Sequence, residues 1–150
     1  MDNEEEYPSN SYSYKILEQI GVGANSIVYK AICLAKNSTE VAIKTIVDDR
    51  SREDVINKFK SITHPNIVKV YCSFMVDGSL WLIMPFFSTN SIESIVTSSF
   101  QNRLSKPCIS FILKDVLKAL SHLHNDRKEI HRDIKGYNTL MDCNGSVRLA

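Results

Sequence analysis

Alternating apolar and polar positions dominate the first 85 residues and predict a sheet. Runs with a period of two, bounded by Gly, Asn, Asp and Pro, cover residues 14–21, 27–33, 41–47, 67–76 and 80–84. Turns are expected at 21–23, 37–38 and 77–78, where glycine, asparagine or aspartate tolerates tight backbone. Between the third and fourth runs, a helical spacing over 55–62 predicts one short helix, which starts at a capping box and ends before Pro65.

Beyond Pro85 the apolar period becomes helical. The pattern predicts a short helix over 91–96 and a longer one over 107–124. The longer helix has an apolar stripe with three charged residues off it, and we interpret the stripe as the face of a buried core helix. The stripe is Ile109, Ile112, Val116, Leu120 and Leu123, and the off-stripe residues are Lys114, Asp115 and Lys118. Strands followed by helices indicate an α+β chain in two lobes, joined at about residues 84–90.

Composition narrows the function class. Residues 1–13 are acidic, rich in Ser, Asn and Tyr, and lack an apolar period, so we expect a flexible tail. A net charge of +1 gives no reason to expect nucleic-acid binding, and no apolar run suggests membrane insertion. The acidic start is unlike a targeting peptide. The four cysteines are scattered, so we expect reduced thiols in a cytoplasmic protein, with the nucleus as a second compartment.

Three motifs carry candidate chemistry. Asp133, Lys135 and Asn138 follow His131 and Arg132, in a segment after a helix and before two short strands. The run 21–28, Gly-Val-Gly-Ala-Asn-Ser-Ile-Val, is a glycine turn between two strands, and Val-Ala-Ile-Lys follows at 41–44. Alone, the glycine turn fits an ordinary hairpin, and the lysine fits a strand residue that faces solvent. Their combination in strand–turn–strand order favours a phosphate-binding site.

These motifs resemble those of protein kinases, namely a glycine-rich loop, a third-strand lysine and an H-R-D-x-K-x-x-N catalytic loop. The lysine two residues after Asp133 marks the serine/threonine type. Segments 64–68, 80–86 and 144–150 are similar to the sterile-twenty-like germinal-centre kinases, and most of all to plant oxidative-stress-responsive-like members. The resemblance implies a small lobe over 14–87, with a five-stranded antiparallel sheet and a short αC helix. It also implies that 91–150 supplies the first helices and the catalytic loop of a large lobe.

The resemblance also assigns roles. Asp133, Lys135 and Lys44 would be catalytic: Asp133 takes the hydroxyl proton, Lys135 meets the transferred phosphate, and Lys44 binds the α- and β-phosphates. Asn138 would hold Mg²⁺. The ATP-binding residues would be Ile20, Gly21, Val22, Gly23, Ala24, Asn25, Ser26, Val28, Ala42, Lys44, Met84, Pro85, Phe87 and Leu140. Met84 would be the gatekeeper, and the adenine would bind the Pro85 carbonyl and the Phe87 N–H. The implied partners are ATP and a protein, either substrate or regulator.

The chain departs from the family pattern at four points. Ser26 replaces the third glycine, and Gly136-Tyr137 replaces the usual small pair. The interval from Lys44 to His64 is about two helical turns short. Its acids are Glu53 and Asp54, and we expect neither carboxylate to reach Lys44. The chain stops where a metal-binding Asp-Phe-Gly would follow. Two interpretations stay open: a serine/threonine kinase represented by a fragment that is inactive alone, or a non-catalytic kinase-like module (a pseudokinase or decoy).

Overall fold

The computed structural model describes residues 6–47, 61–89, 91–99, 101 and 103–150. The chain forms two compact units, one of residues 1–62 with 69–86 and the other of 63–68 with 87–150. The short helix expected over 55–62 lies largely outside the described residues. Glu53 and Asp54 lie outside them too, so the expectation that neither carboxylate reaches Lys44 stays a prediction.

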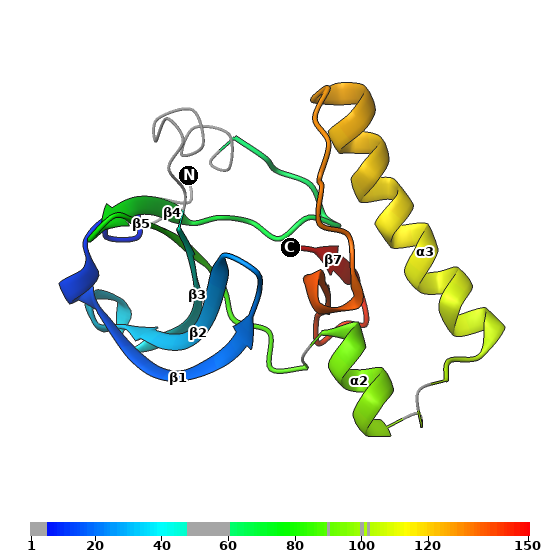
Figure 1. Cartoon of the computed structure of the whole chain (residues 1–150), viewed down its shortest axis with the longest axis horizontal. Helices are drawn as coiled ribbons and strands as arrows, with labels where there is room; N and C mark the ends of the chain where they lie inside the picture. Colours follow the sequence, from blue (N-terminus) through cyan, green and yellow to red (C-terminus); the bar gives the residue numbers. More distant parts are fainter. Residues whose placement is uncertain (1–5, 48–60, 90, 100, 102) are drawn as a thin grey trace. The chain divides into compact units, whose positions relative to one another are not determined.

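The first unit is built on a five-stranded antiparallel sheet (Figure 1). Its strands are β1 (Tyr14–Val22), β2 (Ser26–Cys33), β3 (Thr39–Val47), β4 (Cys72–Val76) and β5 (Ser79–Pro85), with a short 3₁₀ turn, η2 (Leu34–Lys36), before β3. The strand order is β1-β2-β3-β5-β4, and each neighbouring pair is antiparallel. The predicted α+β class and five-stranded sheet are confirmed.

Tight turns set the register of this sheet. Asp77 and Gly78 form the two-residue connection of β4 to β5, with φ angles of 46° and 82°. Two left-handed residues in succession match the twist of a hairpin, and glycine adopts that conformation at no steric cost. Asn37 and Ser38 are also left-handed before β3, at 49° and 58°. The turns predicted at 37–38 and 77–78 are therefore confirmed, because these residue types specify turn geometry locally.

One face of the sheet forms an apolar core, and the N-terminal segment covers part of it. The core consists of Tyr14, Ala31, Cys33, Val41, Ile43, Cys72, Phe74 and Ile83. The Tyr7 ring stacks on Tyr71 with centroids 4.2 Å apart, and the Tyr14 hydroxyl donates to the Pro8 carbonyl at 2.7 Å. Next to these contacts lies a 3₁₀ turn, η1 (Ser11–Ser13). Residues 7–13, which the sequence assigned to a flexible tail, are thus in contact with the sheet through aromatic stacking and one hydroxyl hydrogen bond, without any apolar period.

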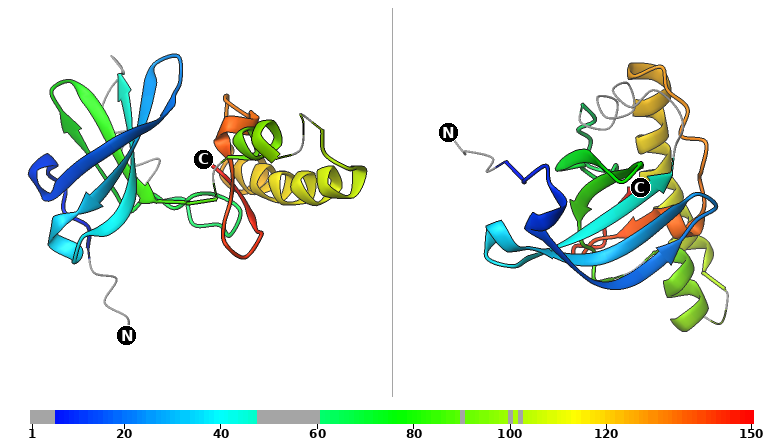
Figure 2. Two further views of the ribbon diagram at one scale, coloured as in Figure 1. Left: turned by 90° about the horizontal axis from the view of Figure 1, so that it is seen from below. Right: turned by 60° about the vertical axis from the view of Figure 1, so that its left-hand side comes forward.

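The second unit combines helices with a small sheet. Its helices are α2 (Ile92–Ser99) and α3 (Lys106–Ser121), and α3 continues into a π-helical turn, η3 (His122–Asp126). A 3₁₀ turn, η4 (Gly136–Asn138), leads into β6 (Thr139–Met141), which pairs antiparallel with β7 (Val147–Leu149). Figure 2 shows α2 and α3 beside this red and orange end of the chain. The Ser105 hydroxyl caps α3 by accepting from the Cys108 amide at 3.4 Å.

The buried face of α3 differs from the predicted stripe. Val116 and Leu123 are buried as expected, whereas Ile109 is 43% exposed. Asp115, predicted to lie off the buried face, is itself buried and accepts a hydrogen bond from the Val147 amide at 3.1 Å. The reason is tertiary: β7 lies against this side of the helix and brings a backbone donor with it. The helix spacing alone gave no sign of that donor.

The predicted strand over 67–76 is also shorter than expected, because β4 begins at Cys72. Residues before it pair with β7 instead. Ile67 forms a parallel bridge with Leu149, and the Val68 amide donates to the Leu149 carbonyl at 2.9 Å. The buried Asn66 side chain donates to the Val147 carbonyl at 2.9 Å. Apolar alternation thus marked an extended segment correctly but assigned its first residues to the wrong sheet.

Candidate functional site

One face of the five-stranded sheet gathers several of the predicted nucleotide-binding residues. Residues directly opposite each other in antiparallel strands share a face, and so do residues two apart on one strand. Val28 pairs with Lys44 across β2 and β3, and Ala42 pairs with Met84 across β3 and β5. All four therefore lie on one face, opposite the apolar core. Ala42 and Met84 are buried there.

The glycine turn lies between β1 and β2. The Gly23 amide donates to the Ser26 carbonyl at 2.7 Å, and the Val47 amide of β3 donates to the Asn25 carbonyl at 3.1 Å. A Cβ at position 23 would lie 2.6 Å from the Ser26 hydroxyl oxygen, so a side chain there would displace Ser26. The turn starts at Gly23, two residues later than predicted, since β1 continues through Val22.

Around this turn the predicted contact residues are largely accessible. Ile20 is 46% exposed and Val22 72% exposed. Ala24 and Asn25 are also exposed, whereas Gly21 pairs with Val28 inside the sheet. Exposed backbone and apolar side chains next to a glycine turn can approach a bound nucleotide without a large rearrangement.

The segment after β5 carries the predicted adenine contacts. Pro85 is the last residue of β5, and Phe86 follows within the same unit. The Lys30 ammonium lies 4.6 Å from the centroid of the Phe86 ring and 2.8 Å from a Glu40 carboxylate oxygen. Phe87 belongs to the other unit, where Arg148 lies 6.0 Å above its ring. Neither cation–π contact could be predicted from the sequence, because in each contact the cation and the ring are far apart in the chain.

The second unit brings together two predicted catalytic residues, Asp133 and Lys135, and the predicted metal ligand Asn138. Lys135 Nζ lies 2.9 Å from Asp133 Oδ1. Asn138 Nδ2 donates to Asp133 Oδ2 and to the Asp133 carbonyl, each at 2.8 Å. The Asp133 and Lys135 side chains are 55% and 41% exposed. One carboxylate is thus held between an ammonium and an amide, and it stays accessible to a second molecule.

Both ring nitrogens of His131 make hydrogen bonds with backbone groups in or next to this loop. The Asp133 amide donates to His131 Nδ1 at 3.2 Å, so that nitrogen carries no proton. Nε2 therefore carries the proton and donates to the Ala150 carbonyl at 2.9 Å. Between them, Arg132 has a φ of 71°, a strained conformation for a residue with a side chain. These contacts give His131 a structural role in the loop.

Glycine is required at position 136 for a structural reason that the sequence did not reveal. A Cβ at this position would lie 2.6 Å from a Glu93 carboxylate oxygen, 3.1 Å from its Cβ and 3.3 Å from its backbone nitrogen. Glycine therefore lets α2 pack against η4. The neighbouring Tyr137 is 65% exposed, so its ring extends towards solvent and does not fill the space around Asp133.

Leu140, a predicted nucleotide contact, lies on β6 directly after η4. It forms an antiparallel bridge with Ser91, the residue that precedes α2. The Thr89 hydroxyl donates to the Met141 carbonyl on the same strand. Thr89 and Ser91 are thus both bonded to β6, which places Leu140 next to the end of the predicted hinge.

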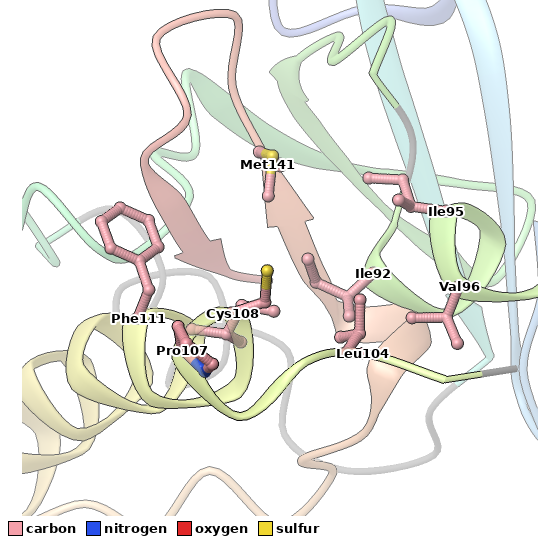
Figure 3. Close-up of a pocket in the computed structure, with 9 residues that line it drawn as sticks. Ile92, Ile95, Val96, Leu104, Pro107, Cys108, Phe111 and Met141 are labelled. Carbon is pink, nitrogen blue, oxygen red and sulfur yellow. The ribbon is translucent and has the colours of Figure 1, made fainter. Parts of the chain in front are cut away.

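An apolar pocket of about 300 Å³ lies apart from these residues, between α2 and the start of α3 (Figure 3). Its lining includes Ile92, Cys108, Phe111 and Met141. The lining has no charged or amide side chain, so it offers no side-chain charge to a phosphate. Ile109, Leu113 and Leu117 are further exposed apolar residues of α3.

Other kinds of site find little support in the described residues. Within that part of the chain, no group of three or more His, Cys, Asp or Glu side chains is placed to hold a metal ion. Nor is any described helix both long and apolar enough to cross a membrane. Cys33 and Cys72 are buried thiols and Cys108 and Cys143 are exposed thiols, and none of the four is in a disulfide.

Comparison with known proteins agrees with this geometry. Residues 14–150 match the protein kinase domain family. The serine/threonine-protein kinase fray2 of Dictyostelium discoideum is 37% identical over 96% of this chain and 14% of that protein. Germinal center kinase 3 of Caenorhabditis elegans is 34% identical over 96% of this chain, and Misshapen-like kinase 1 of Rattus norvegicus is 35% identical over 91%. The chain spans 26% of the former and 11% of the latter.

Proposed function

The chain belongs to the protein kinase domain family, with relatives of the sterile-twenty and germinal-centre type, and from this membership we propose a signalling kinase. Its reaction would be transfer of the ATP γ-phosphate to serine or threonine hydroxyls of protein substrates. The observation that most directly supports this proposal is the contact of Asp133 with Lys135 and Asn138. The chain spans about a quarter or less of the length of these relatives, so the activity of a whole kinase is a proposal here.

In this proposal Asp133 accepts the proton of the attacking hydroxyl. A general base needs a fixed carboxylate that a substrate can reach. Asn138 fixes the Asp133 carboxylate by donating to one oxygen, and the other oxygen faces the Lys135 ammonium. With its own charge partly balanced by Asp133, Lys135 is placed to approach the transferred phosphate as a mobile cation.

The nucleotide would bind the sheet face that carries Val28, Ala42, Lys44 and Met84. Apolar Val28 and Ala42 suit the flat faces of a base, and Lys44 supplies positive charge for phosphates two residues further along β3. Backbone groups would recognise the adenine edge, namely the Pro85 carbonyl and the Phe87 amide. Proline suits the first of these roles because only its carbonyl is used.

Mg²⁺ would bind through oxygen ligands, and the donor set near Asp133 fits this ion. Asn138 donates both hydrogen bonds through Nδ2, so its side-chain oxygen, Oδ1, is turned to other partners. Amide and carboxylate oxygens are ligands that Mg²⁺ prefers. When bound, the ion would neutralise phosphate charge.

Binding of an ATP analogue to the 150-residue chain tests the nucleotide half of the proposal. Isothermal titration would compare wild type with Lys44→Met and with Lys15→Met, an exposed lysine of β1. Loss of a charge-assisted contact should weaken binding about tenfold to a hundredfold in Lys44→Met, since such contacts contribute ~1.5–3 kcal/mol. Lys15→Met should bind like wild type. Equal affinity in all three proteins would remove Lys44 from the site.

Phosphorylation assays on this chain extended with the remaining kinase domain of a relative such as fray2 test the catalytic half. Transfer to a protein substrate that is lost in Asp133→Asn supports a kinase. Nucleotide binding without any transfer in wild type would support the alternative, a non-catalytic kinase-like module. This alternative is suggested by two departures from the family pattern, namely Ser26 and Gly136-Tyr137.

A further inference from the structure

Two histidine rings are stacked in the second unit. The rings of His64 and His122 have centroids 4.9 Å apart and an interplanar angle of 25°. His64 lies in the 63–68 segment, and His122 is the first residue of η3, at the end of α3. His122 Nδ1 lies 2.9 Å from Asp126 Oδ2. The stack therefore joins two segments that are far apart in the sequence.

The hydrogen bonds of His64 require its neutral form. The Asn66 amide donates to His64 Nδ1 at 3.0 Å, so this nitrogen must act as an acceptor. Burial lowers the pKa of His64 from its ordinary value of 6.5, and the nearby His122 lowers it further. Asp126 acts in the opposite direction and Lys118 in the same direction as His122. Two cationic rings in contact would repel, and protonation at Nδ1 would also break the bond from Asn66.

The 63–68 segment, which contains His64, is hydrogen-bonded to β7, and the residue after β7 is hydrogen-bonded to the catalytic loop. The Leu149 amide donates to the Asn66 carbonyl at 2.8 Å. The next residue, Ala150, donates its amide to the Asn138 carbonyl at 2.7 Å and accepts from His131 Nε2 at 2.9 Å. A continuous path of hydrogen bonds thus runs from the His64 side to both ends of the loop that contains Asp133.

We propose that the His64–His122 stack is a proton-sensitive clamp, which orders the catalytic loop at neutral pH and loosens it when both rings are charged. The clamp itself follows from contacts within one unit, whereas its regulatory meaning rests on the proposed kinase function. A kinase built in this way would lose catalytic-loop order on acidification, without any change in its nucleotide-binding face.

The sign of the pH dependence follows from the folded and unfolded states. The folded state binds the His64 proton less tightly than the unfolded state, whose histidine has a pKa of about 6.5. The stabilisation is therefore fully present above about pH 6.5, and it is lost as the pH falls from there through the lower folded value. Local protection from exchange should fall over the same range.

Backbone amide hydrogen exchange of the 150-residue chain, measured by NMR at pH 7 and pH 5, tests the clamp. The probes are the amides of Val68, Leu149 and Ala150, with rates corrected for intrinsic exchange. In wild type we expect protection to fall about tenfold or more. His122→Phe keeps a stacked ring but no charge, and should show a clearly smaller fall, because only the repulsion between the two rings is removed.

Two further variants separate the clamp from general acid sensitivity. His64→Asn keeps an acceptor for the Asn66 amide and cannot be protonated, so it should be insensitive. His124→Phe changes an exposed histidine of the same turn and should behave like wild type. An equal fall in protection in wild type and His122→Phe would overturn the proposal.

The wild-type ring signals give a second measurement that needs no variant. A His64 ring that titrates at or above pH 6.5 would equally overturn the clamp. Failure of ATP-analogue binding would contradict the proposed function and leave these exchange results unaffected, so the two hypotheses fail separately.

Discussion

Replacement of Asp115 by alanine should destabilise the second unit selectively. Val147 is fully buried, and its amide donates to the Asp115 carboxyl group at 3.1 Å. Asp115→Ala would leave this buried donor without an acceptor, which costs about 1–3 kcal/mol. Asp115→Asn keeps an oxygen at the same place and should cost less. Lys114→Ala, at the adjacent exposed position of α3, should change stability by less than about 0.5 kcal/mol.

Two optical probes can follow the two units separately in urea. The single tryptophan, Trp81, lies on β5 in the first unit. Both α-helices of the described chain lie in the second unit, so circular dichroism at 222 nm reports mainly on that unit. With m-values of about 1–3 kcal/mol/M, the dichroism midpoint of Asp115→Ala should fall by on the order of 1 M. The fluorescence midpoint should stay in place. A dichroism shift no larger than that of Lys114→Ala would refute the reasoning.

The remaining predictions concern other parts of the chain. Gly23→Ala should weaken ATP-analogue binding about tenfold by titration calorimetry, because the added Cβ would lie 2.6 Å from the Ser26 hydroxyl oxygen; unchanged affinity would contradict this. Asp133→Asn, in the chain extended with the remaining kinase domain of a relative, should reduce phosphoryl transfer about a hundredfold or more while nucleotide affinity stays constant. Tyr14→Phe should cost about 1 kcal/mol by tryptophan fluorescence, since it removes a hydroxyl that donates to the N-terminal segment.

The parts of the fold that the sequence predicted are those whose causes are local. Strand alternation, the Asp77-Gly78 hairpin and the start of α3 depend on residues within a few positions of each other. The burial of Asp115 and the late start of β4, at Cys72, depend on β7 instead. A strand of three residues has too little pattern to reveal itself, and its partners are distant in the chain.

The same distinction holds for the site. Asp133, Lys135 and Asn138 lie within six residues of each other, so a single turn of chain can bring them into contact, and it does. The need for glycine at 136 could not be predicted, because the residue that excludes a side chain there is Glu93, on another helix. Lys44 and Val28 became neighbours through strand register, which only correct pairing of β2 with β3 reveals.

The conformation of the loop around Asp133 depends more on the hydrogen bonds of His131 and Ala150 than on the ion pair of Asp133 with Lys135. Asp133 and Lys135 are about half exposed, and exposed salt bridges contribute about 0–1 kcal/mol. The left-handed Arg132 costs about 1–3 kcal/mol, so the ion pair alone does not hold the loop in this conformation. The two bonds of His131 and the bond from Ala150 to Asn138 contribute about 0.5–1.5 kcal/mol each and offset that cost. Two of these three bonds end on the residue that follows β7. The geometry around Asp133 is therefore set largely by whatever positions β7, which in this chain is α3 on one side and the 63–68 segment on the other.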